Sequence, residues 1–415
     1  MLFRRNSCDL IKMVKLSKFG GEFLLLALRI NKHIKGYVDF YFGPENLKQL
    51  VENESITSPK KLLNDSNALI KQLGTQSFNK QREHYINKLL IAMKTSTEIL
   101  NGADISFGDR FLRTYDVPLQ SFDESELYDL KEEFNIAYEG SGSLGGRLSK
   151  LREQRKIPKS DVFVLFNKAL KIVKNRTKEL FPNLLPEKEQ IKIELIGNRN
   201  NYKAKWSYYE RYLGNYMSRI EVNPNYNMYW SSLLDAAAHE GYPGHHTEFA
   251  VKEYCLYFKM SQFEHSILLI NSPTLIISEG IANTALNTLF SYRNQAEISL
   301  KEFCSNTHEE VPLNTLIKQY SVKRKLEQFS YNLAYHALLD KWSEEKLTRY
   351  ATGFEIFSKE DINNRMKLLK DPLHSTTSFS YFLGSKLILN KFSEFPSVKN
   401  FINLLTKPIL PSDLF

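Results

Sequence analysis

The chain has 415 residues, of which 42% are hydrophobic and 13% aromatic, so it can bury a substantial core, and disorder is excluded as its main character. Its 56 basic and 47 acidic residues give a net charge of +9, but this excess is mild and spread along the sequence. Because no nucleic-acid-binding signature accompanies the charge, we expect no nucleic-acid partner.

The cysteines and the N-terminal segment bear on the compartment of the protein. Cys8, Cys255 and Cys304 are widely spaced and form no C-x-x-C pair, so neither a disulfide framework nor a cysteine zinc knuckle is predicted. The apolar segment 22–30 is too short to span a bilayer and contains charged residues. We therefore expect a cytoplasmic protein with no membrane association. Met13 is an alternative start that the sequence leaves open.

The first part of the chain shows helical periodicity. From residue 15 to about residue 180, apolar residues recur at helical spacing, as in "EHYINKLLIAMKTSTEIL" at 83–100. The segments 41–47 and 139–150 interrupt this pattern, and the second is rich enough in glycine and serine to predict a turn or mobile loop. The pattern predicts a helical layer.

A short stretch in the middle of the chain changes character. Its segments "IKIELIG" (191–197), "YKAKWSYYERYL" (202–213) and "SRIEVNP" (218–224) are rich in β-branched and aromatic residues. This composition predicts two or three antiparallel strands. We also expect the last segment to pair with an extended peptide, as sheet edges do in other proteins.

Helical periodicity resumes after these strands. It begins at about Tyr229, where Ser231 or Ser232 can cap a helix that runs through Glu240. The clearest later helical segments are 278–303 and 327–347.

The order of elements defines the expected fold class and domain organisation. The sequence predicts a mainly α protein with a small antiparallel sheet before the helix that runs through Glu240. We expect an N-terminal helical region at 1–185 and a second region at 186–415, which contains the sheet and the motifs described next; the two meet over a cleft or form one compact unit.

The segment "AAHEGYPGHHTEF" at 237–249 contains three of the nine histidines beside a glutamate. Clustered histidines and carboxylates are typical of zinc sites. On a regular helix, however, His245 would be rotated by roughly 240° from His239, and His246 would lie about 10 Å further along the axis. A continuous helix therefore suits neither histidine as a second ligand.

Two residues between the histidines resolve this difficulty. Pro243 cannot donate a hydrogen bond to the carbonyl of His239, and Gly244 can adopt unusual backbone angles. The sequence therefore predicts a bulge or loop that folds the histidine pair back toward His239. His245 is the favoured second ligand, with His246 as the alternative, and the remaining histidine would orient the site or contact substrate.

A zinc site with an open fourth position needs a third protein ligand. Glu279 in "IISEGIANTA" is the leading candidate, because it begins a helical segment about 33 residues after His246, far enough for a second helix to pack beside the first. Alone, this glutamate would be an ordinary residue of a helix N-terminus.

These residues resemble a known family, the bacterial and archaeal proteins with an HE-x-x-P-G-H-H signature and a later E-G-x-A motif (domain of unknown function 885). The family is similar to the gluzincin metallopeptidases, including carboxypeptidase Taq. The matching residues are His239, Glu240, Pro243, Gly244, His245, His246, Glu279, Gly280 and Ala282. The chain departs from the pattern at Ile281 and Leu286, where the family has an aromatic residue and an acid. Near the C-terminus it keeps Tyr381 and Gly384.

The resemblance implies a helical metallopeptidase fold and a zinc-dependent hydrolase that cleaves peptides, with carboxypeptidase activity as one option. Glu240 would accept the proton of a zinc-bound water, and Tyr381 would stabilise the oxyanion. Two alternatives stay open. One is a catalytically silent metal-binding or scaffold protein, which the loss of an acid at Leu286 favours. The other is a hydrolase of non-peptide amides or esters.

Overall fold

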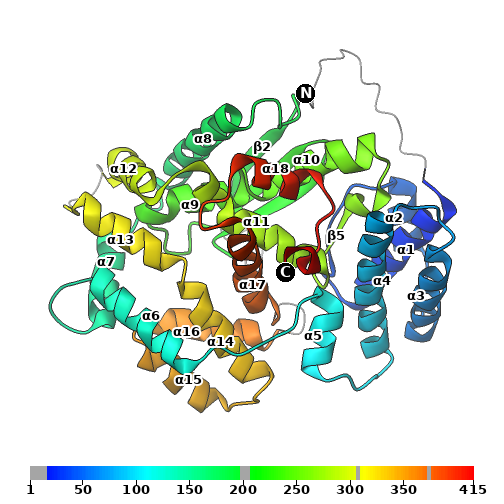
Figure 1. Cartoon of the computed structure of the whole chain (residues 1–415), viewed down its shortest axis with the longest axis horizontal. Coiled ribbons are helices and arrows are strands. Elements are labelled where there is room, and N and C mark those ends of the chain that lie inside the picture. The colour runs from blue at the N-terminus through cyan, green and yellow to red at the C-terminus, as the bar shows by residue number, and fades with distance from the viewer. Residues whose placement is uncertain (1–15, 197–205, 305–308, 372–374) are drawn as a thin grey trace.

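The computed structural model describes residues 16–196, 206–304, 309–371 and 375–415. Cys8 and Met13 lie outside the described residues. In the described part the protein is mainly helical with two small sheets, which confirms the expected fold class at this level (Figure 1).

The first helices form a group at one side of the molecule, drawn in blue in Figure 1. They are α1 (Lys18–His33), α2 (Glu45–Asn53), α3 (Pro59–Leu73) and α4 (Lys80–Leu100). Ser17, Ser58 and Asn79 cap α1, α3 and α4 by accepting hydrogen bonds from backbone N–H groups of the first turn. The helix predicted at 83–100 is thus confirmed, with a start three residues earlier.

The next helices lead from this group across the molecule. They are α5 (Phe107–Tyr115), α6 (Glu124–Ala137), α7 (Leu144–Arg155) and α8 (Val162–Leu180). The prediction of a turn or mobile loop over 139–150 was wrong in its second half, because α7 begins at Leu144. Ser143 accepts a hydrogen bond from the N–H of Gly146, so the serine that looked like a loop residue caps a helix.

The predicted strands form a three-stranded sheet in the order β2 (Gln190–Leu195), β4 (Met217–Val222), β3 (Tyr208–Gly214). β3 and β4 are antiparallel, but β2 is parallel to β4, so the prediction of a purely antiparallel sheet was wrong. Periodicity identifies strands but not their relative direction. A second, unpredicted sheet pairs β1 (Val38–Tyr41) with β5 (Ile267–Leu269).

The helices of the C-terminal half surround a central pair, α11 and α17 (Figure 1). The set is α9 (Leu233–Glu240), α10 (His245–Lys252), α11 (Pro273–Leu289), α12 (Tyr292–Glu302), α13 (Leu313–Lys323), α14 (Leu326–Leu338), α15 (Glu344–Gly353), α16 (Lys359–Leu369), α17 (Thr377–Phe392) and α18 (Val398–Thr406). The segment 278–303 is two helices rather than one, because Ser291 caps α12. The segment 327–347 likewise divides between α14 and α15.

Two large hydrophobic clusters hold these elements together. One contains side chains from α1 to α4 together with Phe263 and Leu410, and the other runs from Phe111 to Leu414. The larger cluster includes α8 and α9, which lie on either side of residue 185. The boundary expected there stays a prediction. Among the described helices, none combines the length and apolar character needed to cross a membrane.

Candidate metal centre

The helix that carries His239 ends at Glu240, and α10 begins at His245, so the predicted break is confirmed. The backbone reverses tightly: the N–H of Gly244 donates to the carbonyl of Ala238 at 3.0 Å. A Cβ on Gly244 would lie 2.0 Å from the carbonyl oxygen of His239, so only glycine fits. The predicted capping of α9 was wrong, because Ser232 makes no capping hydrogen bond there.

This reversal brings two histidines to one carboxylate. The Nε2 atom of His239 lies 3.7 Å from Oε2 of Glu279, and Nε2 of His245 lies 3.9 Å from the same oxygen. The ligand atoms of these three residues all lie within 4.8 Å of one another, with the two imidazole rings perpendicular. Three donors of the kinds that zinc prefers therefore converge from α9, α10 and α11.

The arrangement fits a metal ion in two respects. With bonds of about 2.0–2.2 Å, tetrahedral ligands of zinc stand about 3.4 Å apart, close to the separations found here. In addition, Oε2 of Glu279 is buried and has no hydrogen-bond partner among the residues that the structure describes. A buried carboxylate oxygen without a partner is costly, and a cation between the three groups would satisfy it.

The ionisation of the three groups agrees with such a role. Burial lowers the pKa of His239 to about 4 and that of His245 well below its usual range, so both rings are neutral and can bind metal. Burial, together with the nearby charge of Glu240, raises the pKa of Glu279 well above its ordinary value. A divalent cation would reverse this shift by stabilising the carboxylate.

His246, the alternative ligand, faces the other way. Its Nδ1 lies 2.7 Å from the hydroxyl of Ser218 on β4, and its Nε2 lies 3.1 Å from Oε2 of Glu189. Tyr242 donates to the same oxygen, and Lys174 pairs with the other oxygen of Glu189 at 2.8 Å. Both nitrogens are thus occupied, and the structure brings only His245 of the pair to His239 and Glu279.

A cavity of about 360 Å³ opens beside the three groups. Glu240 lines it, one of its oxygens accepting a hydrogen bond from the backbone N–H of Glu210 on β3 at 3.0 Å. Burial raises the pKa of Glu240 to about 8. The cavity is also lined by β3 residues from Tyr208 to Arg211 and by Asp39, whose carboxylate accepts a hydrogen bond from Tyr209.

Tyr381 lines the same cavity, its ring 6.4 Å from that of His239. It reaches this position because α11 and α17 cross at two glycines. A Cβ on Gly280 would lie 2.6 Å from the carbonyl oxygen of Gly384, and a Cβ on Gly384 would lie 2.2 Å from that of Ile276. The glycines of the later motifs therefore permit the close helix contact that places Tyr381 beside the metal-binding residues.

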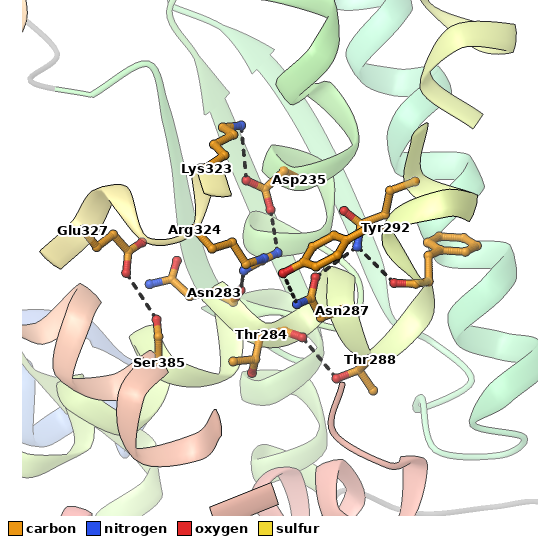
Figure 2. A network of polar contacts seen from close by, with 12 residues as sticks. Asp235, Asn283, Thr284, Asn287, Thr288, Tyr292, Lys323, Arg324, Glu327 and Ser385 are labelled. Atoms are coloured by element: carbon orange, nitrogen blue, oxygen red, sulfur yellow. Dashed lines mark hydrogen bonds and ion pairs between the residues drawn. The ribbon is translucent and has the colours of Figure 1, made fainter. Parts of the chain in front are cut away.

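A residue of α11 also supports the side chain of His239. His239 hydrogen-bonds to the side chain of Asn283, whose amide donates to the carbonyl of Tyr381. Figure 2 shows the neighbouring ionic network, in which Arg324 contacts both Asp235 and the backbone carbonyl of Asn283. Asp235 lies one turn before His239 on α9, so this network anchors the α9 end of the site.

Several residues of the site carry no motif in the sequence. Ser278 contacts Nδ1 of His245 at 3.1 Å and also hydrogen-bonds to Glu248. Glu248 lies three residues after His245, a spacing that places both on one helix face and offers a usable signal. Asn283 lies four residues after Glu279 on α11, so the same spacing argument reaches it, whereas Asp39 comes from β1, which only the fold brings here.

Two further expectations can be compared with the structure. β4, expected to pair with a peptide, lies between β2 and β3 and is hydrogen-bonded on both sides, so that prediction was wrong. Leu286, where the family has an acid, lines a separate small cavity beside Asp235 and Arg324. Its side chain is absent from the lining of the cavity at the metal centre.

The chain matches no model of a known protein family and no curated protein. Its fold is similar to that of a "putative lipoprotein" from Colwellia psychrerythraea, with a TM-score of 0.51 over 89% of this chain and 68% of that one, at 11% sequence identity. A "putative lipoprotein of unknown function" from Shewanella oneidensis aligns at a TM-score of 0.43 and 12% identity, over 87% of this chain and 76% of that one. At this identity the first likeness concerns the fold alone.

Proposed function

We propose that the protein is a zinc-dependent hydrolase, a metallopeptidase of the gluzincin kind that the HE-x-x-P-G-H-H signature resembles. The observation that carries the proposal is the convergence of His239, His245 and the partnerless oxygen of Glu279 beside a cavity that also holds Glu240. Three protein ligands that leave one position open are typical of catalytic rather than structural zinc sites.

Each residue of the site has a chemical task in this proposal. The chemistry that zinc supplies at such a site is Lewis acidity toward a water and a substrate carbonyl. Glu240 follows a ligand in sequence but is absent from the ligand group. A bound cation would offset the effect of burial and favour its ionised form, in which it can accept the proton of water and pass it to the leaving amine. Burial holds the pKa of Tyr381 well above its usual range, so its hydroxyl stays protonated and can donate to the oxyanion.

The cavity suits an extended, partly apolar substrate such as a peptide. Phe249, Leu268, Ile270 and Leu275 provide apolar lining, and Trp206 and Tyr208 add aromatic surface. Many of the other lining residues are charged or polar, so the cavity can also hold the polar groups of a peptide backbone. We keep the cytoplasm as the proposed compartment on the cysteine pattern alone.

The silent-scaffold alternative rested on the missing acid at Leu286. Because Leu286 faces Asp235 and Arg324 in a different cavity, its identity leaves the metal-binding and general-base residues in place. The non-peptide hydrolase alternative shares the same metal chemistry and is separated from the peptidase only by substrate.

The decisive experiment is peptide-library cleavage monitored by mass spectrometry, with the protein loaded with zinc or treated with a chelator. We expect zinc-dependent cleavage, and Glu240→Gln should hold zinc while losing roughly 10²–10⁴-fold of the rate, because the amide cannot accept the proton. Amide and ester substrates run in parallel test the alternative hydrolase.

The outcomes separate the three functions. Cleavage that Glu240→Gln performs as fast as the wild type would remove the general-base role. Turnover of esters or non-peptide amides alone would favour the second hydrolase, and stoichiometric zinc without turnover of any substrate would favour the scaffold.

A further inference from the structure

A buried series of hydrogen bonds begins at the side of His245 that faces away from Glu279. Nδ1 of His245 lies 3.1 Å from the hydroxyl of Ser278, which lies 2.6 Å from Oε2 of Glu248. The other oxygen of Glu248 pairs with the ammonium of Lys252 at 2.5 Å. The series thus joins α11 to two successive turns of α10.

Only one arrangement of protons is consistent with these hydrogen bonds. The ion pair with Lys252 makes Glu248 an acceptor, so the single hydroxyl proton of Ser278 goes to Glu248. The hydroxyl oxygen must then accept a hydrogen bond from His245, which places the imidazole proton on Nδ1. The lone pair of the neutral ring is therefore on Nε2, the atom that faces Glu279.

Burial strengthens the hydrogen bonds that join these residues. Ser278 and Glu248 are each 1% exposed, and the ring of His245 is stacked on Phe249 at an interplanar angle of 10°. Buried hydrogen bonds to charged groups are stronger than exposed ones, and losing one partner leaves the others unsatisfied. The ring of His245 is thus held in both tautomer and orientation.

We propose that Ser278 and Glu248, backed by Lys252, are positioning residues that prepare His245 as a metal ligand. This inference rests on the proposed metal centre. Carboxylate groups that act on metal-bound histidines, directly or through an intermediate, fix the tautomer and raise the basicity of the ligand. Here the serine transmits the charge of Glu248 to the imidazole, whereas His239 hydrogen-bonds to the neutral side chain of Asn283 and feels the charge of Asp235 without a serine between them.

The neighbouring histidine provides a matched control. His246 also contacts a serine hydroxyl, that of Ser218, at 2.7 Å, but it points away from the metal-binding residues. Replacing Ser278 or Ser218 by alanine removes the same atom from adjacent histidines, of which only His245 is a ligand in the proposal.

The experiment measures zinc affinity of the purified full chain by competition with a chromophoric chelator. Ser278→Ala and Glu248→Gln should each weaken zinc binding by roughly 10–100-fold, the range typical of such outer partners. Ser278→Thr, which keeps the hydroxyl, should restore affinity, and Ser218→Ala should bind zinc as the wild type does. With Co²⁺ in place of zinc, the visible spectrum should change in Ser278→Ala and return in Ser278→Thr.

Unchanged affinity in Ser278→Ala, or an equal loss in Ser218→Ala, would overturn the proposal. If Ser278→Ala does not fold, ¹⁵N NMR of the zinc-loaded wild type decides: a proton on Nδ1 of His245 is expected, and its absence refutes the proposal. Zinc binding without hydrolysis by the wild type would refute the proposed function while leaving these affinity measurements valid.

Discussion

The two faces of α10 carry adjacent histidines with opposite surroundings. On the face toward α11, His245 meets His239 and an oxygen of Glu279 that has no hydrogen-bond partner. On the face toward the sheet, His246 is hydrogen-bonded through both nitrogens, to Ser218 and Glu189. The rings are chemically identical and both largely buried, so their difference lies in what the surrounding elements present to them.

This comparison shows how a cluster of buried polar groups that could bind a ligand differs from one that only stabilises the fold. Around His246 each donor has an acceptor, as expected of a buried network that stabilises the fold. Around His245 one ring nitrogen contacts Ser278, while the other converges with His239 and with Oε2 of Glu279, which lacks a hydrogen-bond partner among the described residues. These three groups are the donors that a metal ion would use in the proposed function.

The strongest test of this contrast is to remove each histidine in turn. His245→Ala should weaken zinc binding by more than about 100-fold, because only two protein ligands remain. His246→Ala should keep stoichiometric zinc but lower the free energy of unfolding by roughly 2 kcal/mol, because it leaves Ser218 and Glu189 short of a partner. Metal analysis and urea denaturation of both variants provide the measurements. Loss of zinc from a folded His246→Ala protein would contradict the assignment of the two faces.

The turn that separates the two faces of α10 provides a second test. Gly244→Ala should lower the free energy of unfolding by about 3 kcal/mol and displace His245, since the new Cβ would meet the backbone carbonyl of His239 at 2.0 Å. Gly108→Ala on α5 is the control, because a Cβ there meets nothing within 4 Å and alanine favours a helix. Thermal unfolding and zinc content distinguish the two. A Gly244→Ala protein as stable as Gly108→Ala would refute the close approach.

The smallest effect concerns the pH dependence of stability and tests the face of α10 on which His246 contacts Glu189. Burial alone would raise the pKa of Glu189, but its three hydrogen-bond donors outweigh burial and lower it from 4.5 to about 2. A carboxyl with a depressed pKa stabilises the fold fully above its ordinary pKa, and this contribution is lost as the pH falls from 4.5 toward 2. Relative to Glu189→Gln, the wild type should therefore be more stable at pH 6, by at most about 3 kcal/mol, and this difference should shrink at pH 3.

Urea denaturation at the two pH values measures this difference. Glu345→Gln is the control, because Glu345 is 83% exposed at its side chain and pairs with Arg349 one turn later on the same helix, so its effect should be small at both values. A stability difference for Glu189→Gln that is the same at pH 3 and pH 6 would show that the charge of Glu189 contributes nothing.

Much of the local structure was predictable from the sequence. Helical periodicity predicted α4, and the proline and glycine between the histidines predicted the interruption after Glu240, because both residues act through their own backbone geometry. The donor types of His239, His245 and Glu279 likewise indicated a candidate metal site, and the structure brings these three groups together, while the metal itself stays a prediction. The first two inferences depend on residues within a few positions of one another, whereas Glu279 lies 40 residues after His239 and reaches it only through the packing of α11.

Tertiary structure alone decided what depends on distant partners. Whether His245 or His246 faces Glu279 follows from the packing of α10 between α11 and the sheet, and a rotation of that helix would exchange them. Ser278, Asn283 and Asp39 acquire their places because α11 and β1 bring them to the cavity. Local patterns specify which backbone states a segment favours, but long-range packing selects the neighbours of each side chain, and those neighbours decide which nitrogen of which histidine is free to bind metal.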